Sequence, residues 1–121
     1  ETTYQSVKNS GALNIIIVMD NGVLVKDGKI NTTSTSADSY QGFCQLNKNN
    51  FVYFVIPDGE IVSLKSLATI LKNLGCKDAY RLDGGGSTAL WFKPAGKTEW
   101  THLIGNGSRN KMWNIFYWTE L

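Results

Sequence analysis

The sequence has no long hydrophobic run and little excess charge of either sign. Its longest apolar stretch, Leu13 to Met19, contains Asn14 and is followed by Asp20, so it is far shorter than the ~20 apolar residues that a membrane-spanning helix needs. Lys and Arg number 12 against 10 Asp and Glu, for a formal net charge of +2. The basic residues form no cluster of the kind that follows a phosphate backbone. We therefore expect no membrane span and no nucleic-acid partner.

Cysteine and histidine are also scarce. The two cysteines, Cys44 and Cys76, match no metal-ligand spacing, and the one histidine, His102, has no partner at a diagnostic distance, so we predict no metal centre. The cysteines could pair in an oxidising compartment or remain two buried thiols, and we favour two buried thiols. For His102 we favour a structural or surface role over a catalytic one.

The composition is that of a globular protein. Of 121 residues, 42% are hydrophobic and 18% charged, which excludes a disordered chain. The N-terminus shows no signal-peptide pattern, so we expect a processed product or a fragment. The length fits a single domain, residues 1–121, or a portion of one.

Strand patterns alternate with turn signals, and one stretch has helical periodicity. Apolar positions from Leu64 to Leu74 fall on one face of a helix, with Ser63 placed to cap its start and Gly75 to follow its end. Residues 31–39 are small and polar and predict a loop. Strands are indicated over 13–19, 23–25, 29–30, 51–56, 79–82, 89–92, 100–104 and 112–118. The predicted fold class is α+β, a mainly antiparallel mixed sheet with one principal amphipathic helix packed on it.

Three consecutive glycines directly follow Asp83. Each costs ~0.5–1 kcal/mol in backbone entropy relative to Ala, so such a run is kept where φ is positive or where something approaches the backbone closely. Successive exposed N–H groups in such a turn form a concave site for anions. Asp83 could act there as a general acid or base, accept a sugar hydroxyl or bind a divalent ion. The alternative is a tight turn in which Asp83 bonds only to the backbone.

The motif Leu-Asp-Gly-Gly-Gly-Ser-Thr at 82–88 resembles the signature of the phosphodiester glycosidase domain family, which includes N-acetylglucosamine-1-phosphodiester α-N-acetylglucosaminidase-like enzymes. The preceding helix and residues 78–81 are similar to the family pattern, as is Asn114 before a final aromatic strand, with Arg109 upstream. The resemblance is strongest over 50–118. It implies that Asp83 and Arg109 are catalytic, with Arg109 as the phosphate clamp. The implied substrate-binding residues are Gly84, Gly85, Gly86, Ser87, Thr88 and Asn114.

Two family features are missing. The segment 39–44 contains no arginine where family members carry Arg-Thr-Ala-Ile-Gly, and nothing in residues 1–50 resembles the family motif Asn-Gly-Gly-Phe-Phe. The interval from Arg109 to Asn114 is also one residue longer than the usual one. We therefore expect the C-terminal portion of the domain, with the upstream half on another chain or a reduced relative as alternatives.

The resemblance implies a hydrolase that cleaves a sugar-1-phosphodiester on a glycan or polysaccharide. The alternative is a non-catalytic module that binds glycan or anionic polymer, for example in a cell-surface or phage-particle assembly. We expect a carbohydrate or sugar-phosphate partner and no cofactor, with a divalent cation as the open alternative. Family likeness favours a secreted, lumenal or cell-surface location. Core packing explains most of the tryptophans, and one or two could stack on a sugar ring.

Overall fold

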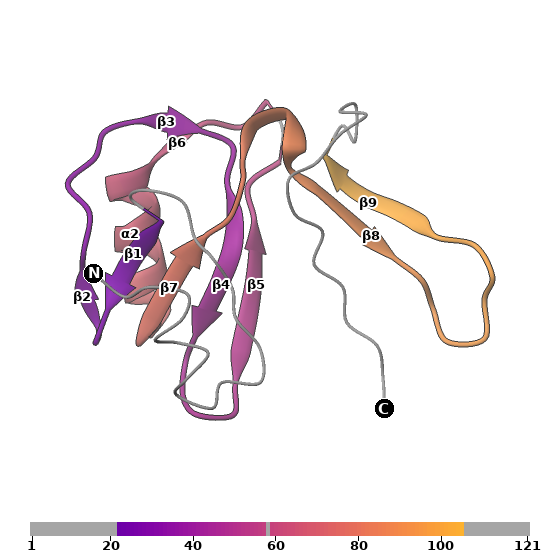
Figure 1. The fold of residues 1–121 in the computed structure, drawn as a ribbon, viewed down its shortest axis with the longest axis horizontal. Coiled ribbons are helices and arrows are strands. Elements are labelled where there is room, and N and C mark those ends of the chain that lie inside the picture. The colour runs from indigo at the N-terminus through magenta and orange to yellow at the C-terminus, as the bar shows by residue number, and fades with distance from the viewer. Residues whose placement is uncertain (1–21, 58, 106–121) are drawn as a thin grey trace, which may run out of the picture.

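The computed structural model describes residues 22–57 and 59–105, and a five-stranded sheet forms its centre (Figure 1). The sheet order is β2-β1-β7-β4-β5, and every neighbouring pair is antiparallel. The strands are β1 (Val23–Lys26), β2 (Lys29–Ile30), β4 (Gln41–Gln45), β5 (Phe51–Val55) and β7 (Asp78–Arg81). The predicted α+β class with a mainly antiparallel sheet is confirmed.

The β1–β2 hairpin and the helix form where the local sequence predicts them. Asp27 and Gly28 both have positive φ, 49° and 71°, as a two-residue turn of type I′ requires. Helix α2 spans Leu64–Asn73, and the hydroxyl of its N-cap, Ser63, accepts a hydrogen bond from the Ser66 N–H. Gly75 follows the helix with φ 91°. Capping residues and apolar spacing therefore suffice to define this helix.

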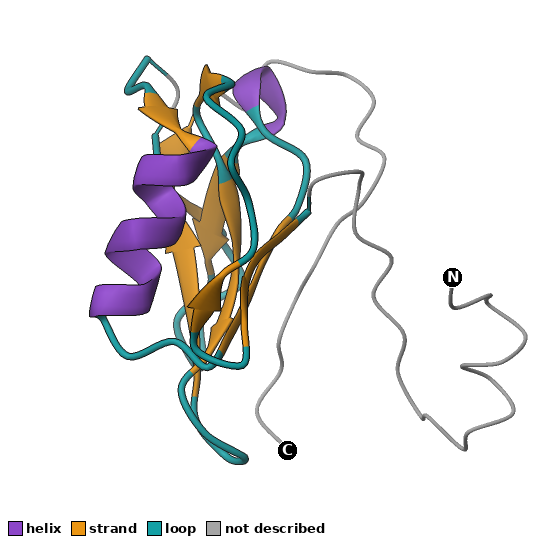
Figure 2. Cartoon of the chain, turned by 90° about the vertical axis from the view of Figure 1, so that its left-hand side faces the viewer, coloured by secondary structure: helices purple, strands orange, loops and turns teal. Residues whose placement is uncertain are grey.

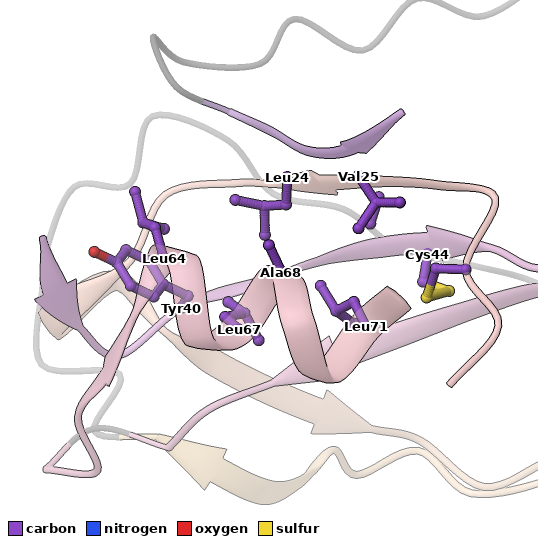
Figure 3. Packing of buried hydrophobic residues seen from close by; sticks show 10 residues of the cluster. Leu24, Val25, Tyr40, Cys44, Leu64, Leu67, Ala68 and Leu71 are labelled. Atoms are coloured by element: carbon purple, nitrogen blue, oxygen red, sulfur yellow. A yellow bond between two sulfur atoms is a disulfide. The ribbon is translucent and has the colours of Figure 1, made fainter. Parts of the chain in front are cut away.

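Helix α2 lies against one face of the sheet (Figure 2), and the core fills the space between them. Figure 3 shows Ala68 of the helix directed toward Leu24 of β1, and Leu67 and Leu71 belong to the same buried cluster as Val25. All five side chains are buried. Burying an aliphatic side chain of this kind contributes ~1.5–3 kcal/mol. The helix is thus attached through the apolar face that its sequence predicts.

The expectation of two buried thiols is wrong. Cys44 and Cys76 are both buried but form a disulfide, with their Cα atoms 5.5 Å apart. The separation of 32 residues gave no sign of this contact. It arises because β4 pairs with β7, which begins two residues after Cys76.

Two short ribbons complete the described fold. Strand β3 (Ala37–Asp38) pairs with β6 (Val62–Ser63), and β8 (Ala89–Phe92) pairs with β9 (Thr101–Gly105), which extends away from the five-stranded sheet in Figure 1. The prediction of a featureless loop over 31–39 is therefore wrong at its end. Strand β4 was not predicted at all. The predicted strands 13–19 and 112–118 lie outside the described residues.

No helix in the described part of the chain is long and apolar enough to cross a membrane.

Candidate functional site

The glycine run lies at one end of the five-stranded sheet, directly after β7 (Figure 1). Strand β4 begins at this same end, because the two strands are antiparallel and Gly42 is opposite Arg81. The segment that leads into β4, residues 38–40, therefore meets the segment that leaves β7. The run itself forms a single 3-10 turn, η1 (Gly85–Ser87), before β8 begins. We call residues 83–88 the glycine loop.

Backbone hydrogen bonds hold the glycine loop in place. The Gly85 N–H donates to the Ser39 carbonyl at 2.9 Å, and within the loop the Ser87 and Thr88 N–H groups donate to the carbonyls of Gly84 and Gly85. The Gly84 N–H donates to Asp83 Oδ1 at 3.0 Å. Among the described residues this leaves Asp83 and Gly86 as the two loop residues whose N–H has no such bond. A concave anion site built from successive loop N–H groups is therefore not formed, because four of the six donors already bond to other groups of the protein.

Three side-chain oxygens of the glycine loop are buried without a hydrogen-bond partner. They are Asp83 Oδ2, Ser87 Oγ and Thr88 Oγ1. Ser87 is 4% exposed and Thr88 is fully buried. A buried polar atom left unpaired costs ~1–3 kcal/mol, and most buried polar atoms in folded proteins are paired. Three buried, unpaired oxygens within six residues are unusual for a folded protein and are typical of a site that binds a polar ligand.

A buried amide supports the loop from the neighbouring strands. Gln41 of β4 donates from Nε2 to the Ser87 carbonyl at 3.2 Å, and its Oε1 accepts a hydrogen bond of 2.7 Å from the Tyr53 hydroxyl on β5. Burial raises the pKa of Tyr53 to about 12, because a low-dielectric environment disfavours the phenolate. The chain from Tyr53 through Gln41 to Ser87 fixes the far end of the loop.

Glycine is required at two loop positions by close neighbours. A Cβ on Gly84 would collide with the Ser39 carbonyl oxygen. Gly85 has φ 57°, and a Cβ there would lie 3.3 Å from Asp38 Oδ2. The glycines therefore allow residues 38 and 39 to pack directly on the loop.

The structure brings together some of the predicted site residues and leaves others undescribed. Asp83 and residues 84–88 form the loop, whereas Arg109 and Asn114 lie outside the described residues. No group of three or more His, Cys, Asp or Glu side chains that could hold a metal ion occurs in the described ranges. Sequence reasoning missed Asp38, Gln41 and Tyr53. Only Gln41 had a signal, since it falls in the segment inspected for the family arginine.

The aromatic ribbon β8–β9 follows the glycine loop. Trp91 stacks on His102, with ring centroids 4.5 Å apart, and Trp91 and Trp100 are about half exposed. His102 thus has an aromatic partner on a surface ribbon, which agrees with a structural or surface role. Core packing does not account for these two tryptophans. Their rings remain accessible: Trp91 lies on β8, which starts beside the site, and Trp100 directly precedes β9.

A family model described as phosphodiester glycosidase matches residues 1–117. The chain belongs to the phosphodiester glycosidase family. The match includes the N-terminal region that lacks the Asn-Gly-Gly-Phe-Phe motif, so it extends well beyond the 50–118 segment on which the resemblance is strongest. No curated protein and no solved structure matches the chain.

Proposed function

We propose that this protein hydrolyses a sugar-1-phosphodiester on a glycan or polysaccharide, with cleavage at the glycine loop. The observation that carries the proposal is the group of three buried, unpartnered oxygens on Asp83, Ser87 and Thr88. Family membership supports the substrate class. Hydroxyls of a sugar are donors of the kind that such oxygens accept.

In this proposal Asp83 is the carboxylate that acts in acid–base chemistry, and the loop residues 84–88 hold the sugar or the phosphate beside it. A phosphate monoester is a better leaving group than a sugar alcohol, so the enzyme depends more on positioning than on strong acid assistance. Arg109 would serve as the phosphate clamp and Asn114 as a substrate contact. Neither a metal nor an organic cofactor is required by this chemistry, although a divalent ion remains an alternative ligand for Asp83.

The first prediction is that Asp83→Asn removes turnover. General acid–base groups contribute ~10²–10⁴-fold, so the kcat of the variant should fall by at least ~100-fold. The substrate is the methyl phosphodiester of N-acetylglucosamine 1-phosphate, and the released sugar is measured as reducing ends. Because Asn retains an oxygen that can accept the Gly84 N–H, the loop conformation should persist. If Asp83→Asn turned over the substrate as fast as the wild type, the carboxylate would not be needed.

A non-catalytic glycan-binding module is the second candidate function. Two observations favour it: Gln41 stands in the segment where the family carries an arginine, and its amide is used inside the protein. The exposed rings of Trp91 and Trp100 suit stacking on sugars. Glycan binding without turnover, retained in Asp83→Ala and lost in Trp91→Ala, would support this function over the enzyme.

The location we propose is secreted, lumenal or cell-surface. The Cys44–Cys76 disulfide supports it, because disulfides form and persist mainly in oxidising compartments.

A further inference from the structure

The site has a second carboxylate that the sequence did not suggest. We propose that Asp38, on the short strand β3, is a catalytic residue that takes a proton from the attacking water. This inference rests on the proposed hydrolysis of a sugar-1-phosphodiester and names a further group for it.

The carboxylate of Asp38 lies directly against the glycine loop. Its Oδ2 and Oδ1 atoms are 3.3 and 3.6 Å from the position that a Cβ on Gly85 would occupy. Gly85 is two residues after Asp83 and begins η1. The absence of a side chain at Gly85 is therefore what lets the Asp38 carboxylate reach the loop backbone. The loop is flanked by Asp83 at its start and by Asp38 over its first turn.

Hydrogen bonds fix the Asp38 side chain in this position. The Ser39 N–H donates to Asp38 Oδ1 at 2.8 Å, and the carbonyl of the same buried Ser39 accepts from the Gly85 N–H at 2.9 Å. Asp38 is also paired with Val62 in the β3–β6 ribbon. Asp38 Oδ2 has no donor bound to it among the described residues. One carboxylate oxygen is therefore held by the backbone of Ser39, the residue that itself bonds to the loop, and the other oxygen is left for chemistry.

The two carboxylates occupy different environments. Asp38 is exposed, whereas Oδ2 of Asp83 is buried and Oδ1 accepts from the Gly84 N–H. A base that activates water must be reached by water, and Asp38 meets this condition. Hydrolysis of glycosidic bonds commonly uses a pair of carboxylates, and two carboxyl groups in unlike surroundings suit unlike tasks. Asp83 would then act on the bound sugar, and Asp38 on the water.

Asp38 Oδ2 takes one proton from water, and the water oxygen forms a bond to the anomeric carbon of the sugar. The bond between that carbon and the phosphate oxygen breaks, and its electron pair leaves with the phosphate. The products are the free sugar, the phosphate monoester as its anion and protonated Asp38, which returns its proton to solvent.

The test compares Asp38→Asn with the wild type, measuring the pH profile of kcat on the methyl phosphodiester of N-acetylglucosamine 1-phosphate. Asn keeps an oxygen to accept the Ser39 N–H bond and removes only the charge. We expect kcat to fall by about 100-fold or more, with KM changed by less than about twofold. The decline of kcat at acidic pH should disappear, because it reports protonation of the base. In Asp38→Ala, whose smaller side chain leaves room for a small carboxylate, added formate should restore part of the lost rate.

Asp27→Asn is the matched control. Asp27 is an exposed carboxylate in the β1–β2 turn, away from the loop in Figure 1, and its positive φ is tolerated by Asn. Its kcat and pH profile should equal those of the wild type. Should Asp38→Asn fail to fold, Asp38→Ser replaces it, because a serine hydroxyl can accept the same N–H bond.

The outcomes separate this inference from the proposed function. Suppose that the wild type is active, that Asp83→Asn is inactive, and that Asp38→Asn keeps more than about half the wild-type kcat together with its decline at acidic pH. Asp38 is then not the base, while the proposed function stands. If the wild type has no turnover on this diester or on the corresponding diesters of other sugar 1-phosphates, the proposed function fails and the inference fails with it.

Discussion

At the scale of single residues, the site depends on Gln41, whose amide can satisfy two different neighbours at once. The Ser87 carbonyl can only accept, so it must face the NH₂ group of the amide. The Gln41 oxygen is then directed to the Tyr53 hydroxyl, which donates to it. An arginine at this position has no acceptor, so the Tyr53 hydroxyl could not donate to it. The glutamine thus serves the loop as a support rather than as a phosphate ligand.

Removing the Tyr53 hydroxyl should weaken this support. Tyr53→Phe leaves the Gln41 oxygen without that donor, and we expect a loss of about 1 kcal/mol in the free energy of unfolding, measured by urea denaturation. The folded-state pKa of about 12 exceeds the ordinary value of 10.0. The stability linked to Tyr53 is therefore fully present below pH 10 and is lost as the pH rises through 12. Ultraviolet absorbance should show a late phenol ionisation that disappears in Tyr53→Phe.

Tyr80→Phe is the control for this measurement, since Tyr80 is a half-buried tyrosine on β7. Removing the Tyr80 hydroxyl should leave the late phenol ionisation visible in the absorbance titration. If the late ionisation persisted in Tyr53→Phe and disappeared in Tyr80→Phe, it would belong to Tyr80 on β7 and not to Tyr53 on β5. That result would contradict the prediction.

At the scale of elements, β4 connects the two halves of the site, and Gly42 makes its position possible. A Cβ at residue 42 would collide with the Tyr80 carbonyl oxygen and would come within 2.8 Å of Phe54 Cζ and 2.9 Å of Arg81 Cα. Strands β5 and β7 thus pack closely around β4 at this point. The start of β4, with Gln41 and the preceding Asp38, can then lie beside the glycine loop.

Gly42→Ala should be strongly destabilising. Inserting a methyl group where the backbone of β7 already lies forces the strands apart, which costs about 1–3 kcal/mol or more. Urea denaturation measures the loss. Gly28→Ala is the matched control: Gly28 has φ 71° but no atom within 4 Å of a Cβ, so it reports backbone strain alone, at about 1 kcal/mol. Equal losses in the two variants would mean that the close contacts at Gly42 relax without cost.

The comparison of β4 with α2 shows what the sequence can predict. The helix and the β1–β2 hairpin depend on residues within a few positions of one another, so caps, turns and periodicity identify them. Strand β4 contains glycine and two glutamines, residues without a strong strand preference, and it forms because β5 and β7 lie on either side of it. The site divides in the same way. Asp83 is found from a contiguous motif, whereas Asp38 approaches the loop only through the pairing of distant strands.

At the scale of the whole molecule, the disulfide ties β4 to the chain just before β7. These two strands carry the two sides of the site. The bond closes a loop with a sequence separation of 32, which spans β5, β6 and α2. Cross-linking a loop of this length removes conformational freedom from the unfolded chain, so the described fold is stabilised as one unit.

Loss of the disulfide should therefore lower the free energy of unfolding by about 3–4 kcal/mol, the chain-entropy value for a loop of this length. The double variant Cys44→Ala, Cys76→Ala tests this by urea denaturation. A reductant should lower the wild-type midpoint toward that of the double variant and should leave the double variant unchanged. A wild-type midpoint insensitive to reductant during unfolding would contradict the expectation.

The hydrogen-bonded chain from Ser87 to Tyr53 has one more consequence. It joins the glycine loop to a chromophore on β5, at the edge of the five-stranded sheet. Any ligand that displaces the Ser87 carbonyl alters the Gln41 amide that accepts the hydrogen bond from the Tyr53 hydroxyl, and with it the absorbance and the NMR resonance of that phenol. The absorbance of Tyr53 thus reports whether a ligand occupies the glycine loop, and it can reveal binding in the unlabelled protein before any product is formed.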